Sequence, residues 1–123
     1  MQMTTSSRIK LDHIIKAMEE LGHPVFAIDL NKDEINNRDS FFVYNDKGNI
    51  SRVEGANQYK MEFTVMYISK VHDDIDEITL IDKLIRYGLI FVDSTRDEAK
   101  FKGTDQTALV ITLNFTQIFR LCR

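Results

Sequence analysis

An alternating segment at residues 59–69, YKMEFTVMYIS, constrains the fold more than any other part of the sequence. Its odd-numbered positions from Tyr59 to Tyr67 are all apolar or aromatic, whereas the positions between them begin with lysine, glutamate and threonine. A two-residue period puts the apolar side chains on one face of an extended strand. Met66 and Ile68 interrupt the polar face, so we expect that end of the strand to be covered on both sides. The segment therefore predicts a long strand with one face on a core.

A first helix is predicted to start near Arg8. Apolar residues recur there at steps of three and four, which is the period of an amphipathic helix: Leu11, Ile14, Ile15, Met18 and Leu21. Ser6 or Ser7 can accept hydrogen bonds from the free amides of its first turn. Gly22 suits the left-handed position just after a helix, and Pro24 cannot continue one. The helix is thus expected to end before Pro24.

A second helix is predicted to begin after Asp73 or Asp74, either of which can cap it. Asp74 and Glu77 have the spacing of a capping box, and their negative charge suits the positive end of a helix. One apolar stripe follows: Ile75, Ile78, Ile81, Leu84 and Ile85. Gly88 is expected to end this helix.

Shorter apolar runs between turn signals predict the remaining strands, at residues 25–28, 41–44, 89–92, 98–102 and 109–115. A turn at residues 102–106 joins the last two. Residues 45–58 contain two turn signals, around Gly48 and Gly55, and are predicted to form an extended, exposed hairpin arm. The polar stretch at residues 31–40 is predicted to be a loop.

The order of these elements indicates one α+β domain covering residues 1–123, with residues 1–7 flexible. We expect a mixed or mainly antiparallel sheet of about four to five strands packed by two helices. The periodicities also predict the residues of its core: Leu11, Ile14, Ile15, Met18, Phe63, Val65, Ile78, Ile81, Leu84, Leu109, Ile111 and Leu113.

Composition excludes several classes of partner and location. The formal net charge of the 123 residues is −3, so the chain lacks the basic field with which proteins bind phosphate backbones, and no specific nucleic acid is expected. Cys122 is the single cysteine, which excludes an intrachain disulfide and a cysteine-based zinc site. No segment resembles a signal peptide or a membrane span, so we expect a cytoplasmic protein without a membrane partner.

The sequence carries no recognisable enzymatic motif, and it assigns no catalytic, cofactor-binding or metal-binding residue. The histidines, His13, His23 and His72, have no metal-ligand spacing. His72 begins the only cluster of metal-capable groups, residues 72–77, but helix capping already explains its acids. Other carboxylates lie in polar stretches that indicate solvated surface: Asp33, Glu34, Asp93, Asp97 and Glu98. Ser69 and Ser94 lack the context of a nucleophile, and no glycine-rich phosphate loop is present.

One local basic patch has two interpretations. Its residues would be Lys100, Lys102, Arg120 and Arg123, near the aromatic side chains of Phe101 and Phe119. Such a mixture is a weak sign of a nucleic-acid surface. Lysines that protect an edge strand from aggregation explain Lys100 and Lys102 equally well, and the overall negative charge favours this second interpretation.

Several stretches together make the sequence resemble the tail terminator, or tail-completion, proteins of long-tailed bacteriophages. They are EELGHPVFAIDL after the first helix, FFVYNDKGN, the strand YKMEFTVMYIS, the acidic-capped helix DDIDEITLIDKLIRYGLIF and the closing strand ALVITLNFTQIFR. These stretches span nearly the whole chain. The resemblance lies in the layout of the elements as much as in the residues.

The resemblance implies a minor structural protein without a catalytic residue. Such proteins form a homo-oligomeric ring, generally a hexamer, at the head-proximal end of the tail tube. The ring ends polymerisation of the tube and allows head-tail joining, so the expected partners are tail tube and head-completion proteins. The expected location is the host cytoplasm during assembly and then the tail or neck of the virion. Residues 31–40 and 45–58 are the candidates for assembly surfaces, because the core does not require their length.

Two other functions remain open on the sequence. A small cytosolic binding protein of phage origin, such as an inhibitor of a host factor, would share the acidic surface and the lack of catalytic motifs. A small enzyme with an unrecognised site would need a pocket lined by converging polar groups. Oligomeric state separates the structural protein from the binding protein.

Overall fold

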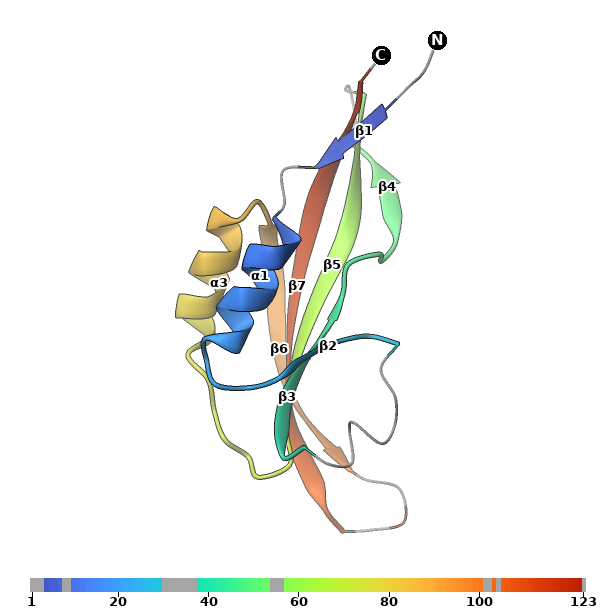
Figure 1. Ribbon diagram of the computed structural model, residues 1–123. Helices are drawn as coiled ribbons and strands as arrows, with labels where there is room; N and C mark the ends of the chain where they lie inside the picture. The colour runs from blue at the N-terminus through green and yellow to red at the C-terminus, as the bar shows by residue number, and fades with distance from the viewer. Residues whose placement is uncertain are drawn as a thin grey trace.

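In the described part of the computed structural model, two helices pack on one face of a seven-stranded sheet (Figure 1). The structure describes residues 4–7, 10–29, 38–53, 57–100, 103 and 105–122. The elements follow in the order β1 (Thr4–Ser7), α1 (Leu11–Glu19), β2 (Val25–Ala27), β3 (Ser40–Asn45), β4 (Ile50–Arg52), β5 (Gln58–Ser69), α3 (Glu77–Arg86), β6 (Ile90–Lys100) and β7 (Thr107–Cys122).

The sheet is mixed and mostly antiparallel, which confirms the predicted α+β class. Its strands run in the order β1-β7-β5-β3-β2, with β4 added to β5 and β6 added to β7. Only the pairing of β2 with β3 is parallel among the strand pairs of the described residues. The sheet has more strands than predicted because the short strands β1 and β4 pair with one end of the long central pair.

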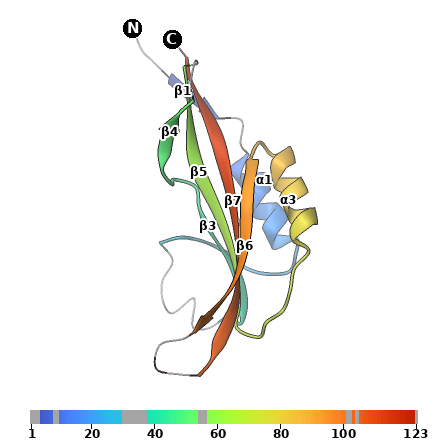
Figure 2. The ribbon, with the colours of Figure 1, turned by 180° about the vertical axis from the view of Figure 1, so that it is seen from behind.

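The central pair, β5 and β7, forms the spine of the molecule. Phe63 lies opposite Phe115 and Val65 opposite Leu113, so the inward faces of the two strands coincide. Seen from behind, β5, β7 and β6 lie in front of both helices (Figure 2). Phe63, Val65 and Tyr67 are buried on the helix side, as the alternation predicts.

Most of the predicted core residues are buried or pack against the core. The structure buries Ile14, Met18, Phe63, Val65, Leu84, Ile111 and Leu113, and it packs Leu11, Ile15, Ile81 and Leu109 against them. The prediction for Ile78 is wrong, because its side chain is 81% exposed. Leu80 is fully buried in its place. The buried face of the second helix is therefore rotated from the predicted one, with Leu84 and Ile81 still in or against the core and Leu80 buried where Ile78 was expected.

Both helices also begin later than predicted. Helix α1 starts at Leu11, and its N-cap residue Lys10 makes no side-chain capping hydrogen bond. Ser6 and Ser7 belong instead to β1, which pairs with the last residues of β7, in a segment expected to be flexible. Asp76, rather than Asp73 or Asp74, caps α3, and its carboxylate accepts a hydrogen bond from the backbone N–H of Thr79. The edge that β7 offers beyond β6 explains why the N-terminal segment is extended.

Half of the predicted hairpin arm lies against the sheet. Strand β4 pairs with β5, with Ile50 opposite Met61, and the backbone N–H of Val53 donates to the carbonyl of Gln58. Residues 54–56 of the arm lie outside the described residues, as do residues 31–37 of the predicted loop. The two extended segments expected at residues 89–92 and 98–102 are one continuous strand, β6, with a bulge between Phe91 and Asp93.

Candidate interaction surfaces

The sheet continues past the ends of the helices, and its apolar face opens there as a recess. The recess has a volume of about 530 Å³, and its lining comes from β4, β5, β7 and the turn before β4: Asp46, Lys47, Gly48, Ile50, Met61, Gln117 and Phe119. We call this surface the apolar recess. Ile50 is 61% exposed and the nearby Tyr59 is 38% exposed. Apolar side chains on this part of the sheet therefore face solvent instead of a helix.

Close backbone contacts hold the wall of the recess in place. The buried Gln117 donates a hydrogen bond of 2.6 Å from Nε2 to the carbonyl of Asp46. The backbone N–H of Gly48 donates to the carbonyl of Glu62, and the N–H of Glu62 donates to the carbonyl of Asn49, each over 3.0 Å. The turn at residues 46–49 is thus clamped onto β5. Because a buried amide without a partner is costly, Gln117 also specifies where this turn sits.

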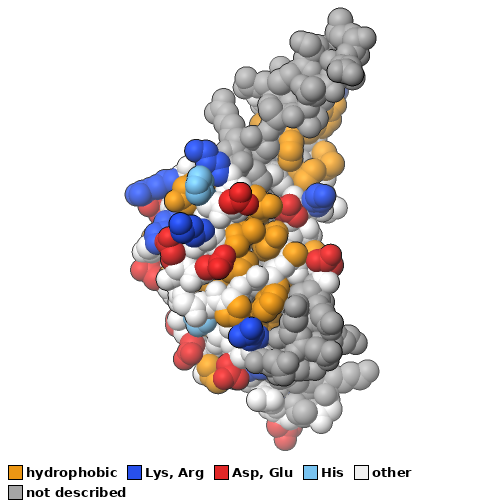
Figure 3. Space-filling model, viewed as in Figure 1, with side chains coloured by type: hydrophobic (Ala, Val, Ile, Leu, Met, Phe, Trp, Pro, Cys, Tyr) orange, Lys and Arg blue, Asp and Glu red, His pale blue; other side chains and the backbone are white. Residues whose placement is uncertain are grey.

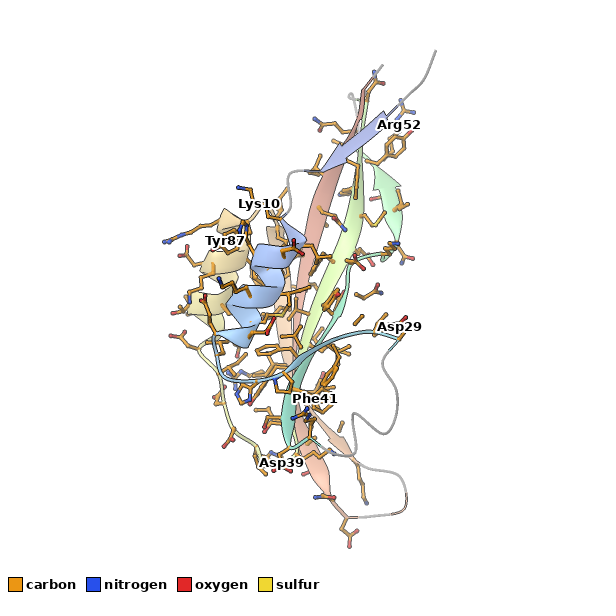
Figure 4. All side chains as sticks on the ribbon, viewed as in Figure 1. Lys10, Asp29, Asp39, Phe41, Arg52 and Tyr87 are labelled. Carbon is orange, nitrogen blue, oxygen red and sulfur yellow. The ribbon has the colours of Figure 1, made fainter. Side chains whose placement is uncertain are left out.

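The views of the surface agree with this placement. Figure 3 shows hydrophobic side chains exposed beside β4 and again lower on the same face, alongside α1. Figure 4 shows Arg52 at the upper end of the sheet, far from Lys10 and Tyr87 near the helices. Tyr44 lies on β3 below the recess, and burial, with help from Asp46 and Asp29, raises the pKa of its hydroxyl.

A second apolar surface lies on the outside of α3. Ile78, Ile81 and Ile85 follow one another at steps of three and four, so they share one side of the helix. Ile78 is 81% exposed and Ile85 is 46% exposed, while Ile81 is partly buried. We call these three residues the outer stripe of α3. The sequence singles out all three as apolar and periodic and predicts Ile78 and Ile81 in the core, where the structure places Ile81 against the core and leaves Ile78 exposed.

An ion-pair cluster joins the start of α3 to β6. Arg96 of β6 donates to both carboxylate oxygens of Asp74, over 3.2 and 2.9 Å, and also pairs with Glu77. These contacts raise the pKa of Arg96, and those with Arg96 and with the N–H of Ile75 lower the pKa of Asp74. The cluster holds Glu77 toward β6, in the orientation of α3 that buries Leu80 and Leu84 and leaves Ile78 and Ile85 exposed.

The predicted acidic cluster at residues 72–77 is thus dispersed among structural contacts. Asp76 caps α3, Asp74 binds Arg96, and Nε2 of His72 lies 3.0 Å from Oγ1 of Thr107. In the ranges that the structure describes, no three histidine, cysteine, aspartate or glutamate side chains gather as metal ligands would. The absence of a divalent metal at this cluster stays a prediction.

The capping carboxylate of Asp76 gives a pH-dependent prediction. Its hydrogen bonds from the hydroxyl and the backbone N–H of Thr79 lower its pKa below the usual value for aspartate. The unfolded chain then binds the proton more readily, so this contribution to stability is complete above about pH 4 and is lost as the pH falls through the lowered pKa. We expect Asp76→Ala to lower the urea midpoint at pH 7, and the difference from wild type to shrink at pH 3.

The control for this measurement is Asp97→Ala, which removes an exposed carboxylate from β6 and should leave the midpoint unchanged at both pH values. A difference between wild type and Asp76→Ala that stays constant from pH 7 to pH 3 would show that the carboxylate charge does not cap α3.

Strand β6 forms a long exposed edge. Among the described residues it pairs with β7 alone, so its outer backbone groups face solvent. The strand carries Asp93, Arg96, Asp97, Glu98 and Lys100. Charged side chains on an edge disfavour pairing with another strand. The bulge near Phe91 adds to this protection.

A polar groove of about 520 Å³ lies on the face of the sheet without helices. Its lining consists of Asn49, Ser51, Lys60, Glu62, Thr64, Val92, Asp93, Asn114, Phe115 and Thr116. Nδ2 of Asn114 donates to Oδ1 of Asp93 over 2.7 Å, which fixes both side chains. The groove offers donors and acceptors from four strands, but its charged groups are exposed.

The remaining candidates from the sequence do not converge on one site. Two members of the predicted basic patch, Lys100 and Phe119, lie far apart. Lys100 pairs with Asp105 at 3.8 Å and lies opposite Thr107. Phe119 lies twelve residues beyond Thr107 along β7, which is roughly 40 Å in an extended strand. The other members of the predicted basic patch, Phe101, Lys102, Arg120 and Arg123, have side chains outside the described part. Asp33 and Glu34 also lie outside it. Of the two serines, Ser69 is buried and hydrogen-bonded to Ser40, while Ser94 is exposed.

Gln117 and Gly48 are determinants of the recess that were not predicted from the sequence. Gln117 occupies an inward position of β7, in phase with Leu113 and Phe115, so a polar residue at a core-facing position is the signal that points to it. Gly48 carries no such signal, because its role depends on a contact with Glu62 on a different strand.

Comparison with known proteins does not assign the chain to a family. None of the helices in the described ranges has the length and apolar composition needed to cross a bilayer. No protein-family model matches the sequence, and the curated proteins contain no significant match to it.

Proposed function

We propose that this chain is a non-enzymatic structural subunit that assembles into a homo-oligomeric ring, as the phage tail terminators that it resembles do. In this proposal the ring sits at the head-proximal end of the tail tube, ends its polymerisation and allows the head to join. The protein acts in the host cytoplasm during assembly and then becomes part of the virion. Its partners are copies of itself, the tail tube and head-completion proteins.

One observation carries this proposal: apolar surface is left uncovered at two separate places, the apolar recess and the outer stripe of α3. Ile50 at the first and Ile78 at the second are both more exposed than buried. Exposed apolar patches on a folded domain mark sites of interaction with other proteins. Two different patches suit a head-to-tail contact, which generates a ring when the rotation between copies closes.

The charged edge of β6 also supports assembly through side chains instead of strand addition. Alternating charges along this strand disfavour continuation of the sheet into a neighbour. A subunit that joined its neighbours by β6 would form an open-ended sheet as readily as a ring. The proposal therefore places the contacts between copies on the helix side of the sheet and at β4.

The experiment that tests the function is deletion of residues 47–55 with a short turn closing the gap. This change removes β4 and the wall of the recess but leaves α1, α3 and the buried residues of β5 and β7. We expect circular dichroism to keep its wild-type shape, because β4 pairs over three residues only, and the melting temperature to fall, because the hydrogen bonds between the turn at residues 46–49 and β5 are lost. Light scattering should show loss of the ring, and an infection that supplies only this variant should give unjoined heads and tails of abnormal length.

The matched control is the triple substitution of Ile50, Ser51 and Arg52 by threonine, which keeps β4 as a strand while removing its apolar side chain. It should fold as the wild type does and assemble as poorly as the deletion. Joined particles with normal tails from the deletion variant would contradict the proposed role of this segment.

A second candidate function, a small binding protein that inhibits a host factor, is favoured by the polar groove. Its donors and acceptors, including the fixed pair Asn114 and Asp93, suit a polar segment of a partner. Mass in solution separates the two functions, because an inhibitor of this kind acts as a single copy. A chain that stays monomeric at all concentrations and does not bind tail tubes would favour the second function.

A further inference from the structure

The outer stripe of α3 cannot be buried by its own molecule. Leu80 and Leu84 are fully buried in the core, and Ile81 packs against that core at the inner edge of the stripe. Arg96 pairs with Asp74 and Glu77 at the start of the helix. The part of the stripe that stays uncovered is therefore Ile78 and Ile85. Turning Ile78 inward would expose both leucines and break these ion pairs. The stripe is therefore a convex apolar ridge that only another molecule can cover.

The apolar recess is the complementary shape, a concave apolar surface on the same side of the sheet. Ile50, Met61 and Phe119 supply its apolar lining, and its volume of about 530 Å³ is comparable to a pocket that receives a few side chains. In Figure 1, α1 and β7 lie between α3 and β4, so the two surfaces are well separated within one copy. An amphipathic helix that lays its apolar residues into a groove is a common form of protein recognition.

The charges at the start of α3 are opposite to those around the recess, while Lys83 and Arg86 in the last turn of α3 pair with Glu20 and Asp82. Asp73 and Asp76 flank the stripe at the start of α3, and Lys47 and Arg52 flank the recess, where Asp46 is the one acid. Arg52 lies two residues beyond Ile50 and so on the same face of β4. Within the described part of the chain, neither Lys47 nor Arg52 has an ion-pair partner, and neither do Asp73 and Asp76.

We propose that the outer stripe of α3 in one copy docks into the apolar recess of the next copy, with the acids at the start of α3 facing Lys47 and Arg52. The two surfaces are different, so the contact is head-to-tail and each copy uses both. This inference rests on the proposed function, because it names the contact that joins the subunits of the proposed ring.

The test uses two single substitutions at exposed positions and their mixture. Ile78→Glu places a negative charge on the stripe, and Ile50→Glu places one in the recess, so the two altered surfaces repel each other in a mixture. Each variant should raise the Kd of self-association by about thirtyfold or more, the loss typical of a central interface residue, and should sediment as a monomer where the wild type does not. A mixture of the two variants should form dimers and nothing larger, because each supplies the one surface that the other lacks.

Ile28→Glu is the matched control, since Ile28 is 53% exposed in the turn after β2 and belongs to neither surface. This control should assemble as the wild type does, and all three variants should keep the wild-type circular dichroism. Variants at Ile78 and Ile50 that still form the wild-type ring would overturn this contact and leave the proposed function standing. A mixture that stays monomeric would also overturn this contact. So would a wild-type chain that is monomeric from micromolar to millimolar concentration. If that monomeric wild-type chain also fails to bind tail tubes, the proposed function is removed as well.

Discussion

Replacing Leu84 with alanine is expected to lower the free energy of unfolding by about 2–5 kcal/mol, the range for a fully buried leucine. Leu84 has no exposed surface and packs into the cluster formed by α1, α3 and the sheet. Truncation removes apolar contacts and leaves a cavity that this layer between two helices and a sheet cannot fill without moving α3.

The matched substitution is Ile78→Ala on the same helix, which should change the free energy of unfolding by less than about 0.5 kcal/mol, because Ile78 is 81% exposed. Urea titration monitored by circular dichroism measures both variants, and the slope should stay constant. Equal losses for the two variants would mean that α3 presents its other face to the sheet. That result would also remove the outer stripe as an interaction surface.

Replacing Gly48 with alanine is expected to cost about 1–3 kcal/mol, the range for forcing extra atoms into a well-packed site. A Cβ at this position would lie 2.7 Å from Cβ of Glu62 and 2.8 Å from its carbonyl oxygen. The oxygen belongs to the backbone of the central strand and cannot turn away. The turn at residues 46–49 must therefore lift from β5, and the hydrogen bond from the N–H of Gly48 to Glu62 is lost with it.

The effect should appear in assembly as well as in stability, because Gly48 lines the apolar recess. Hydrogen exchange at the amide of Glu62 should accelerate in Gly48→Ala, since this amide donates to Asn49 in the same turn. Lys47→Ala is the control for stability, because its side chain is exposed and its loss creates no clash. An unchanged midpoint and unchanged exchange in Gly48→Ala would show that the turn does not sit against β5.

The sequence by itself determines the elements whose signal is local. The alternation in residues 59–69 predicts β5 and its inward face, because a two-residue period has one physical solution in a strand with a core on one side. The apolar spacing from Leu11 to Met18 predicts α1 and its buried side for the same reason. The α+β class follows from the order of such elements.

Long-range contacts decide what the sequence leaves open. The apolar residues of helix α3 cover more than one side of it, so its periodicity fits more than one orientation. Packing against the sheet buries Leu80 and Leu84 and exposes Ile78, and the ion pairs from Arg96 on β6 are compatible with that orientation. Strand β1 forms because the end of β7 offers an unpaired edge, and no local pattern around Ser6 and Ser7 indicates that partner.

The candidate surfaces depend on the tertiary structure even more strongly. The recess exists because β5 and β7 extend beyond the helices that cover the rest of the sheet. Gln117 and Gly48 also hold the turn at residues 46–49 against the sheet. Those contacts join residues far apart in the chain: Gln117 and Asp46 are separated by 71 positions. Periodicity reports which side chains are apolar and which share a face. Only the packed structure shows which apolar faces meet within the molecule. It also shows which ones stay uncovered, as the outer stripe of α3 and the recess do. Whether a face is covered depends on where each element ends relative to its neighbours.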